Sequence, residues 1–283
     1  MSLARTRPVN AGTEVAAAGA RWRRAERPLA LALLLGALSS SAWLALVWLS
    51  ASPYGRFIAH EGWGEIDALV GLCRAIPGGD TVVPVVLHAL VWVLMIAAMM
   101  LPTTYPVLSL FRRIVRGRSD GTRLTAIVIL GFFAAWFMFG VVAHGADALL
   151  LRGAQAVPAV TSHGWVLGAV VLAGAGFFQF SALKYRCLEQ CHTPFAFINA
   201  RWRGRAPARE AWRIGLDHGL FCVGCCWAIM LLMFVVGVGN LGWMLALAAV
   251  MAAEKNLPWG RHLRAPLGIG LIAWAALIAL TRG

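Results

Sequence analysis

Apolar residues gather along this chain in long uninterrupted stretches rather than in the short periods of a soluble fold. Seven stretches approach or reach the roughly 17 to 25 residues of a membrane-spanning helix, the last three near the short end. They are Pro28–Leu49, Thr81–Leu101, Leu124–His144, Gly164–Leu183, Ile214–Val236, Leu241–Ala253 and Ala265–Leu280. The pattern predicts an all-α, polytopic transmembrane bundle of about seven spanning helices.

Polar segments divide these stretches. Between the fifth and the sixth, the run from Gly237 to Gly242 is rich in glycine and asparagine, which tolerate the backbone of a sharp reversal. It predicts a helical hairpin, with one overlong kinked helix as the alternative. Residues 1–27 are polar and basic, and we expect a disordered lead there, followed by a transmembrane domain over residues 28–283.

Composition agrees with a membrane protein. Hydrophobic residues make up 60% of the chain and charged residues only 13%, whereas soluble domains carry about 25% charged residues. The formal net charge of +13 would suggest nucleic acid in a soluble protein, but here the basic residues lie between apolar stretches. We therefore expect them to face anionic lipid and no nucleic acid.

The loop charges predict an orientation. Basic residues gather before the first stretch, between the second and third, between the fourth and fifth, and after the sixth. Because basic loops stay in the cytoplasm, this predicts a cytoplasmic N-terminus and, with seven spans, an external C-terminus. The first stretch is longer than a usual signal peptide core, so we interpret it as a retained anchor.

Candidate metal ligands cluster near the fourth and fifth stretches. Cys187, Cys191 and His192 follow the fourth stretch, and the fifth carries a second group of ligands in its first half. That second group is His218, Cys222, Cys225 and Cys226. The predicted orientation puts both groups at the cytoplasmic end of the bundle, where a reducing environment disfavours structural disulfides.

Helical geometry brings the second group onto one stripe. At about 100° per residue, its four side chains span about 100°, yet His218 and Cys226 lie about 12 Å apart along the axis. One ion cannot reach all four. Either two sites form, or one site combines Cys222 with Cys225 or Cys226 and with ligands from elsewhere, for which Cys187 and Cys191 are the natural partners.

The second stretch offers thioethers. His88, Met95 and Met99 share one face of a helix, Met100 lies beside Met99, and Met233 follows the cysteine stripe of the fifth stretch. Thiolate with thioether favours Cu(I), and thiolate with imidazole also suits Zn, although methionine in such helices is usually packing. The predicted metal ligands are Cys187, Cys191, His192, His218, Cys222, Cys225, Cys226, Met95, Met99 and Met100.

Several other residues have simpler interpretations. Asp217 and Glu254 lie near the predicted cytoplasmic boundary, where solvated or capping roles are the default. Gly215 and Gly219 form a small-xxx-small pair, which predicts close helix packing. His88 is a costly polar group in lipid that could simply donate to a carbonyl. No role is assigned to Cys73, and an outer site at His144 and His163 is only weakly indicated.

The motifs that carry these ligands resemble a known family. The matching runs are Met99–Pro102, Leu183–Cys187 with Cys191, Gly215–Trp227, Glu254–Lys255 and Pro258–Gly260. Together they resemble the bacterial predicted metal-binding integral membrane proteins of domain of unknown function 2182, over most of the chain from about Thr81 to about His262. The resemblance implies metal binding in a bacterial inner membrane, and some similar proteins are proposed to deliver copper to a copper oxidase.

Three functions follow from these residues. The first is a metal chaperone that binds Cu(I) and passes it to a metal-receiving protein or across the bundle. The second is a thiol oxidoreductase that uses Cys222 and Cys225, whose spacing suits a redox pair. The third is an assembly subunit whose metal only joins helices. No catalytic triad, phosphate loop or nucleotide motif is evident, so an enzymatic function ranks low.

Overall fold

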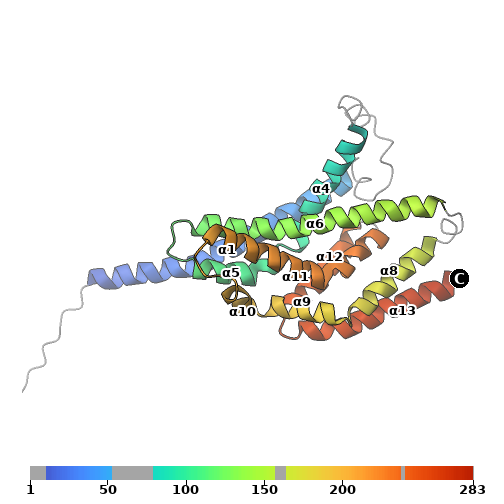
Figure 1. Cartoon of the computed structure of the whole chain (residues 1–283). Coiled ribbons are helices and arrows are strands. Elements are labelled where there is room, and N and C mark those ends of the chain that lie inside the picture. Colours follow the sequence, from blue (N-terminus) through green and yellow to red (C-terminus); the bar gives the residue numbers. More distant parts are fainter. Residues whose placement is uncertain (1–10, 53–78, 157–163, 237–239, 283) are drawn as a thin grey trace, which may run out of the picture.

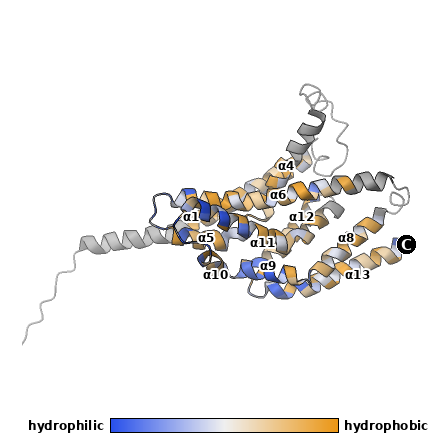
Figure 2. Ribbon diagram, viewed as in Figure 1, coloured by the Kyte–Doolittle hydropathy of each residue, from blue (hydrophilic) through white to orange (hydrophobic). Residues whose placement is uncertain are grey.

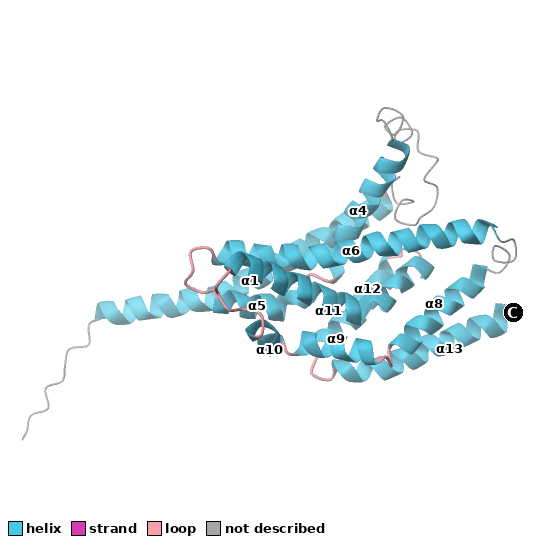
Figure 3. Ribbon diagram, in the orientation of Figure 1, coloured by secondary structure: helices cyan, strands magenta, loops and turns pink. Residues whose placement is uncertain are grey.

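The computed structural model describes residues 11–52, 79–156, 164–236 and 240–282, and these ranges form helices without any strand (Figure 1, Figure 3). This confirms the all-α class. The longer helices are α1 (Ala11–Ala51), α4 (Gly79–Met99), α5 (Tyr105–Ile114), α6 (Gly121–Ala156), α8 (Gly164–Phe178), α9 (Ala182–His192), α11 (Pro207–Val236), α12 (Leu241–Asn256) and α13 (Arg264–Arg282). Three short elements are η1 (Pro102–Thr104), α10 (Pro194–Asn199) and η2 (Gly260–Leu263).

Four helical segments are long and apolar enough to cross a membrane. They are Leu29–Ala51, Gly121–Ala146, Pro207–Met233 and Gly260–Arg282. Two bent pairs qualify when each is taken as one span: Ala89–Met99 with Pro102–Ile114, bent by 49°, and Trp165–Phe178 with Ala182–His192, bent by 59°. The described residues therefore contain four to six candidate spans, which agrees with a multi-pass membrane protein.

The predicted sixth span is short. Helix α12 has 16 residues, which extend about 24 Å and fall below a hydrocarbon core of about 30 Å. It is a separate helix from α11, and the Asn240 side chain caps it by accepting a hydrogen bond from the backbone nitrogen of Trp243 at 3.0 Å. Two separate helices thus replace the alternative of one overlong helix, while the predicted turn at Gly237–Gly239 lies outside the described residues and the hairpin stays a prediction. The count of seven spans and the cytoplasmic N-terminus stay predictions.

A proline breaks the second predicted span. Pro102 has no backbone N–H, so the carbonyl of Ala98, four residues earlier, loses its helical donor. The Ser39 hydroxyl of α1 donates to that carbonyl at 2.8 Å, and the Thr103 hydroxyl donates to the Met100 carbonyl at 2.8 Å. The chain therefore turns through η1 into α5 directly after Met99 and Met100, with its free carbonyls satisfied inside the bundle.

The fourth predicted span is also broken, which corrects the expectation of one helix from Gly164 to Leu183. Helix α8 ends at Phe178, and Ser181 caps the new helix α9 by accepting a hydrogen bond from the Lys184 backbone nitrogen at 3.1 Å. A serine hydroxyl competes well for the first free N–H groups of a helix, so the chain restarts there at a new angle. The break turns the α9 cysteines towards α11.

Helices α6 and α11 approach closely at glycines. A Cβ built on Gly215 would lie 2.1 Å from the Val128 carbonyl oxygen, and one on Gly219 would lie 2.6 Å from the Ala135 Cβ. Gly131 of α6 has the same restriction, because its Cβ would lie 2.6 Å from the Trp212 carbonyl oxygen. The predicted role of Gly215 and Gly219 in close packing is confirmed.

Polarity is divided between the two ends of the bundle. Hydrophilic residues gather around α9, α10, the end of α5 and the beginning of α11, whereas α8 and most of α13 are mainly apolar (Figure 2). Large apolar side chains such as Leu33, Val141 and Leu280 are exposed on the outer faces, as expected for contact with lipid. Helix α1 begins at Ala11, and the division into a disordered lead and a domain from residue 28 stays a prediction.

Candidate metal-binding site

Five buried cysteines gather between α9 and α11, and we refer to them as the thiol cluster. Its members are Cys187, Cys191, Cys222, Cys225 and Cys226, all present as free thiols. None is more than 9% exposed, and the three on α11 are at most 1% exposed. Cys222 lies 15 residues after Pro207 and 11 before Met233, the ends of its candidate span. The cluster is therefore near the middle of α11, deeper than the sequence predicts.

Contacts between the two helices bring the thiols together. The sulfurs of Cys225 and Cys226 are 3.4 Å apart, and the Cys191 thiol lies within hydrogen-bonding reach of Cys225. The Cys187 sulfur packs directly on the backbone of α11, because a Cβ built on Gly224 would lie 2.6 Å from it. The structure thus places the cysteines of α9 against those of α11, while their role as metal ligands stays a prediction.

A buried lysine from α12 faces the cluster, and sequence reasoning missed it. Lys255 is 5% exposed. Its Nζ donates to the Cys222 sulfur at 2.7 Å and lies 3.8 Å from the Met100 sulfur. It also interacts electrostatically with Cys191, Cys225 and Cys226. Among the described residues no carboxylate pairs with Lys255, so a cysteine sulfur is its closest partner able to carry a negative charge.

A second buried lysine, Lys184, forms an ion pair with a buried carboxylate. Lys184 of α9 donates to Glu254 of α12 at 2.7 Å and also to Gln179, and the two charged side chains are 0% and 1% exposed. The default expectation for Glu254, a solvated or capping role, is therefore wrong. Its carboxylate is buried because the last turn of α12 is buried in the bundle, and it compensates the charge of Lys184.

The two predicted histidine ligands have other partners. His192 Nε2 lies 2.9 Å from the Glu254 backbone oxygen. The His218 ring packs beside Phe132 and Phe197, with centroids 5.8 and 5.7 Å apart, and its Nδ1 has no hydrogen-bond partner among the described residues. Within the residues that the structure describes, neither imidazole forms a hydrogen bond with a thiol. Asp217, by contrast, is partly exposed and pairs with Arg201 at 2.7 Å.

The predicted methionines lie in the same apolar core as the thiol cluster. Met95, Met99, Met100 and Met233 are each at most 2% exposed and belong to one continuous buried cluster with all five cysteines. Met230, Met244 and Met251 belong to it as well. Of the predicted three, Met100 contacts Lys255, with its sulfur 3.8 Å from the lysine Nζ. The thiols are therefore embedded in soft, polarisable side chains.

Other candidates contribute less. The side chain of His88, like Cys73 and His163, lies outside the described residues. The His144 ring packs against Trp92 at 5.7 Å. Within the described ranges, no group of three or more Cys, His, Asp or Glu side chains has a geometry that could hold a metal ion.

The chain matches a known protein family. A family model described as "PpoB2: Copper chaperone" matches residues 89–278, about two thirds of the chain. The matched region includes the thiol cluster, Met95, Met99, Met100, both buried lysines and Glu254. Neither characterised proteins nor solved structures give a match.

Proposed function

The chain belongs to the PpoB2 copper chaperone family, and we propose that it binds Cu(I) at the thiol cluster and delivers it to a copper-requiring protein. Family membership and the helical fold together make it a copper-related, multi-pass membrane protein. The proposal adds the oxidation state, the ligands and the delivery role. It also adds the location, a bacterial inner membrane, and a recipient such as a copper oxidase, which the family resemblance implies.

The contact between Lys255 and Cys222 carries this proposal. A lysine ammonium buried in a low-dielectric interior is costly unless an anion compensates it. Because Glu254 pairs with Lys184, the anion nearest to Lys255 is the thiolate form of Cys222, 2.7 Å away. Cysteine binds metal as the thiolate. The lysine thus favours a deprotonated sulfur in the membrane interior, ready for a soft cation.

Cu(I) suits this site better than zinc does. Structural zinc usually takes four ligands in a tetrahedron, and the described residues supply no group of three or more candidate ligands with suitable geometry. Cu(I) is soft and is stable with two thiolates. Cys222 and a second thiol of the cluster can supply these, with Met100 beside them. The metal-binding experiment described below also measures bound zinc.

Charge balance also favours a site with two thiolates. Two thiolates and one Cu(I) carry a net charge of −1, which the ammonium of Lys255 neutralises. Loading then requires only that the second thiol loses its proton as the copper ion arrives. A divalent ion with the same ligands would leave an excess positive charge in the apolar core, which is unfavourable.

Copper stoichiometry tests the binding site. The purified chain would be titrated with Cu(I) under anaerobic, reducing conditions against a chromogenic chelator. Wild type should hold about one tightly bound ion. Cys222→Ser should lose it, and Cys73→Ser, which removes a thiol distant in sequence from α9 and α11, should retain it. Equal copper content in all three proteins would contradict the proposal, and zinc retained in place of copper would refute the choice of metal.

A cavity lined by Asn256, the residue that follows Lys255, offers a route for delivery. It has a volume of about 390 Å³ and lies between α1, the break after α4 and the end of α12, where Gly36, Pro102 and Asn256 line it. A Cβ on Gly36 has nothing within 4 Å, so Gly36→Trp should fill this space. The variant should slow copper transfer to an external chelator without changing stoichiometry. Gly270→Trp, at another open helical position, is the control.

The same proteins separate the two alternative functions. The Cys222 sulfur accepts from Lys255, and Cys225 donates to the Cys222 carbonyl at 3.2 Å, so these two thiols have separate partners. A Cys222–Cys225 disulfide trapped under oxidising conditions, with no copper bound, would favour an oxidoreductase. Copper that never exchanges, with unfolding of the Cys222→Ser variant, would favour an assembly subunit with a structural metal.

A further inference from the structure

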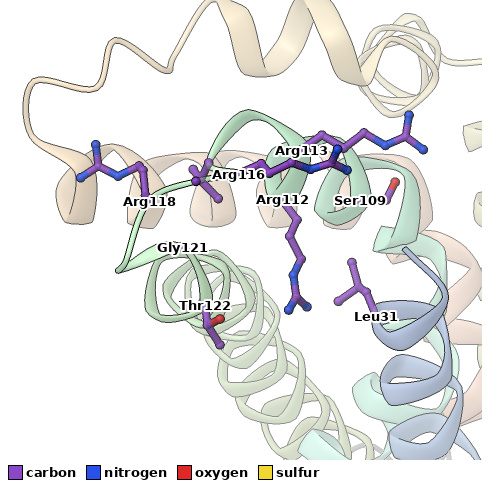
Figure 4. Close-up of a pocket in the computed structure, with 10 residues that line it drawn as sticks. Leu31, Ser109, Arg112, Arg113, Arg116, Arg118, Gly121 and Thr122 are labelled. Atoms are coloured by element: carbon purple, nitrogen blue, oxygen red, sulfur yellow. The ribbon is translucent and has the colours of Figure 1, made fainter. Parts of the chain in front are cut away.

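The end of α5 forms a cavity whose charge the copper site does not explain. It has a volume of about 320 Å³ and lies between α1, α5 and the start of α6. We call it the arginine pocket, and its main lining residues are Leu31, Ser109, Arg112, Arg113, Arg116 and Thr122. Figure 4 shows Arg112 extending into the space between Leu31 of α1 and Thr122 of α6, whereas Arg118 at the rim points away.

The backbone holds this pocket in shape. Gly117 has φ +93°, a left-handed conformation that glycine adopts readily, and it reverses the chain between α5 and α6. The Arg118 backbone nitrogen donates to the Val115 carbonyl at 3.2 Å. A Cβ on Gly121 would lie 3.1 Å from the same carbonyl oxygen, so the turn packs tightly on the start of α6. Three arginines therefore project from a firmly packed corner.

The pocket has an excess of positive charge. Arg118 pairs with Asp120 at 2.8 Å. Across the described ranges, by contrast, Arg112, Arg113 and Arg116 form no ion pair with a carboxylate. Arginine presents a planar set of donors that matches the oxygens of a phosphate group. Three uncompensated guanidinium groups around one cavity thus suit a phosphate-bearing anion.

Exposed apolar side chains flank the apolar wall of the pocket. Leu31, which lines it, belongs to α1, whose neighbouring side chains Leu29, Leu33 and Leu34 are 51 to 64% exposed. The pocket lies at the hydrophilic end of the bundle, where the apolar surface begins (Figure 2). Basic pockets between membrane helices bind anionic head groups in this position. We propose that the arginine pocket binds a phosphate group, presented by the head group of an anionic phospholipid.

The test compares phospholipids on the purified full-length chain. Dissociation constants for phosphatidylglycerol and phosphatidylcholine would be measured in detergent by native mass spectrometry. Wild type should prefer phosphatidylglycerol. Each arginine should contribute about fivefold, since a basic residue near an anionic surface gives about 1 kcal/mol. Arg112→Gln with Arg116→Gln should therefore weaken phosphatidylglycerol binding about 25-fold. Phosphatidylcholine binding should weaken much less, because its choline cation offsets the charge of the phosphate.

Two controls make the result specific. Arg209→Gln with Arg213→Gln removes the same charge from exposed arginines at the start of α11 and should bind phosphatidylglycerol like wild type. The second control adds inorganic phosphate. If millimolar phosphate displaces the lipid from wild type but not from a variant without Arg112, the pocket's ligand is free phosphate and not a lipid head group. Equal binding of phosphatidylglycerol by both double variants, or no preference over phosphatidylcholine in wild type, would overturn the proposal.

Discussion

Removing one member of the buried pair between Lys184 and Glu254 should destabilise the protein strongly. Their charged atoms are 2.7 Å apart with exposures of 0% and 1%, and they join α9 to α12. These two helices carry Cys187 with Cys191 and Lys255, respectively. Loss of the pair should therefore loosen the helices around the thiol cluster as well as lower the free energy of unfolding.

The magnitude follows from burial. Truncating one partner of a buried ion pair costs about 3 to 5 kcal/mol, because the other charge is left uncompensated. Glu254→Leu leaves the Lys184 ammonium with Gln179 as its remaining partner, and Lys184→Met leaves the Glu254 carboxylate without its cation. Replacing both removes both charges. The double variant should then cost less than about 2 kcal/mol, which gives a coupling energy of several kcal/mol.

The free energy of unfolding would be measured for all four proteins of this cycle by titration with dodecyl sulfate in mixed micelles. Arg118→Gln is the control, because Arg118 and Asp120 form an ion pair that is 41% and 34% exposed and should contribute less than about 1 kcal/mol. Copper content should fall in the single variants and recover partly in the double variant. Single variants no weaker than the control, or a double variant equal to their sum, would refute this reasoning.

Three further predictions concern helix packing and the charge at the site. Gly215→Ala places a Cβ 2.1 Å from a backbone oxygen of α6 and should lower the free energy of unfolding by at least about 2 kcal/mol. Gly174→Ala, whose Cβ would have nothing within 4 Å, should leave the free energy of unfolding unchanged. Equal stability of the two variants would contradict the close packing of α6 and α11. Lys255→Met should weaken Cu(I) binding at least about tenfold in chelator competition, because the loaded site keeps an uncompensated negative charge. An unchanged affinity for Cu(I) would exclude a role of Lys255 in charge compensation. Gly224→Ala places a Cβ 2.6 Å from the Cys187 sulfur and should displace that thiol, so that maleimide labels Cys187 faster than in wild type. A labelling rate equal to that of wild type would argue against the contact.

Regular spacing along one helix made part of the site predictable. Cys222, Cys225 and Cys226 repeat at intervals that lie on one stripe, and the stripe depends only on helical geometry. The same applies to Gly215 and Gly219, whose spacing indicated close packing. Cys187 and Cys191 are one turn apart and so share a face, which made them candidate partners for the thiols of α11. These features need no knowledge of distant contacts.

The charged part of the site was not predictable in this way. Lys255 and Cys222 are 33 residues apart, and Lys184 and Glu254 are 70 apart, so nothing local indicates that they meet. The hydrophobic pattern also gave no sign that the last turn of α12, with Glu254 and Lys255, is buried in the bundle. A charged residue at the end of an apolar stretch is usually solvated, which is why the sequence predicts a boundary position for Glu254. The break at Ser181 depends on a single capping hydroxyl, which is weak evidence inside an apolar sequence.

The contact between Lys255 and Cys222 also bears on the membrane voltage. An elementary charge that crosses the full membrane potential changes in energy by about 2.3 kcal/mol per 100 mV. At the proposed site the ammonium and the thiolate already cancel, and an arriving Cu(I) replaces the proton of a second thiol. Loading then exchanges one positive charge for another at the same depth. We therefore expect copper occupancy to be independent of the transmembrane potential and to respond to the proton concentration instead.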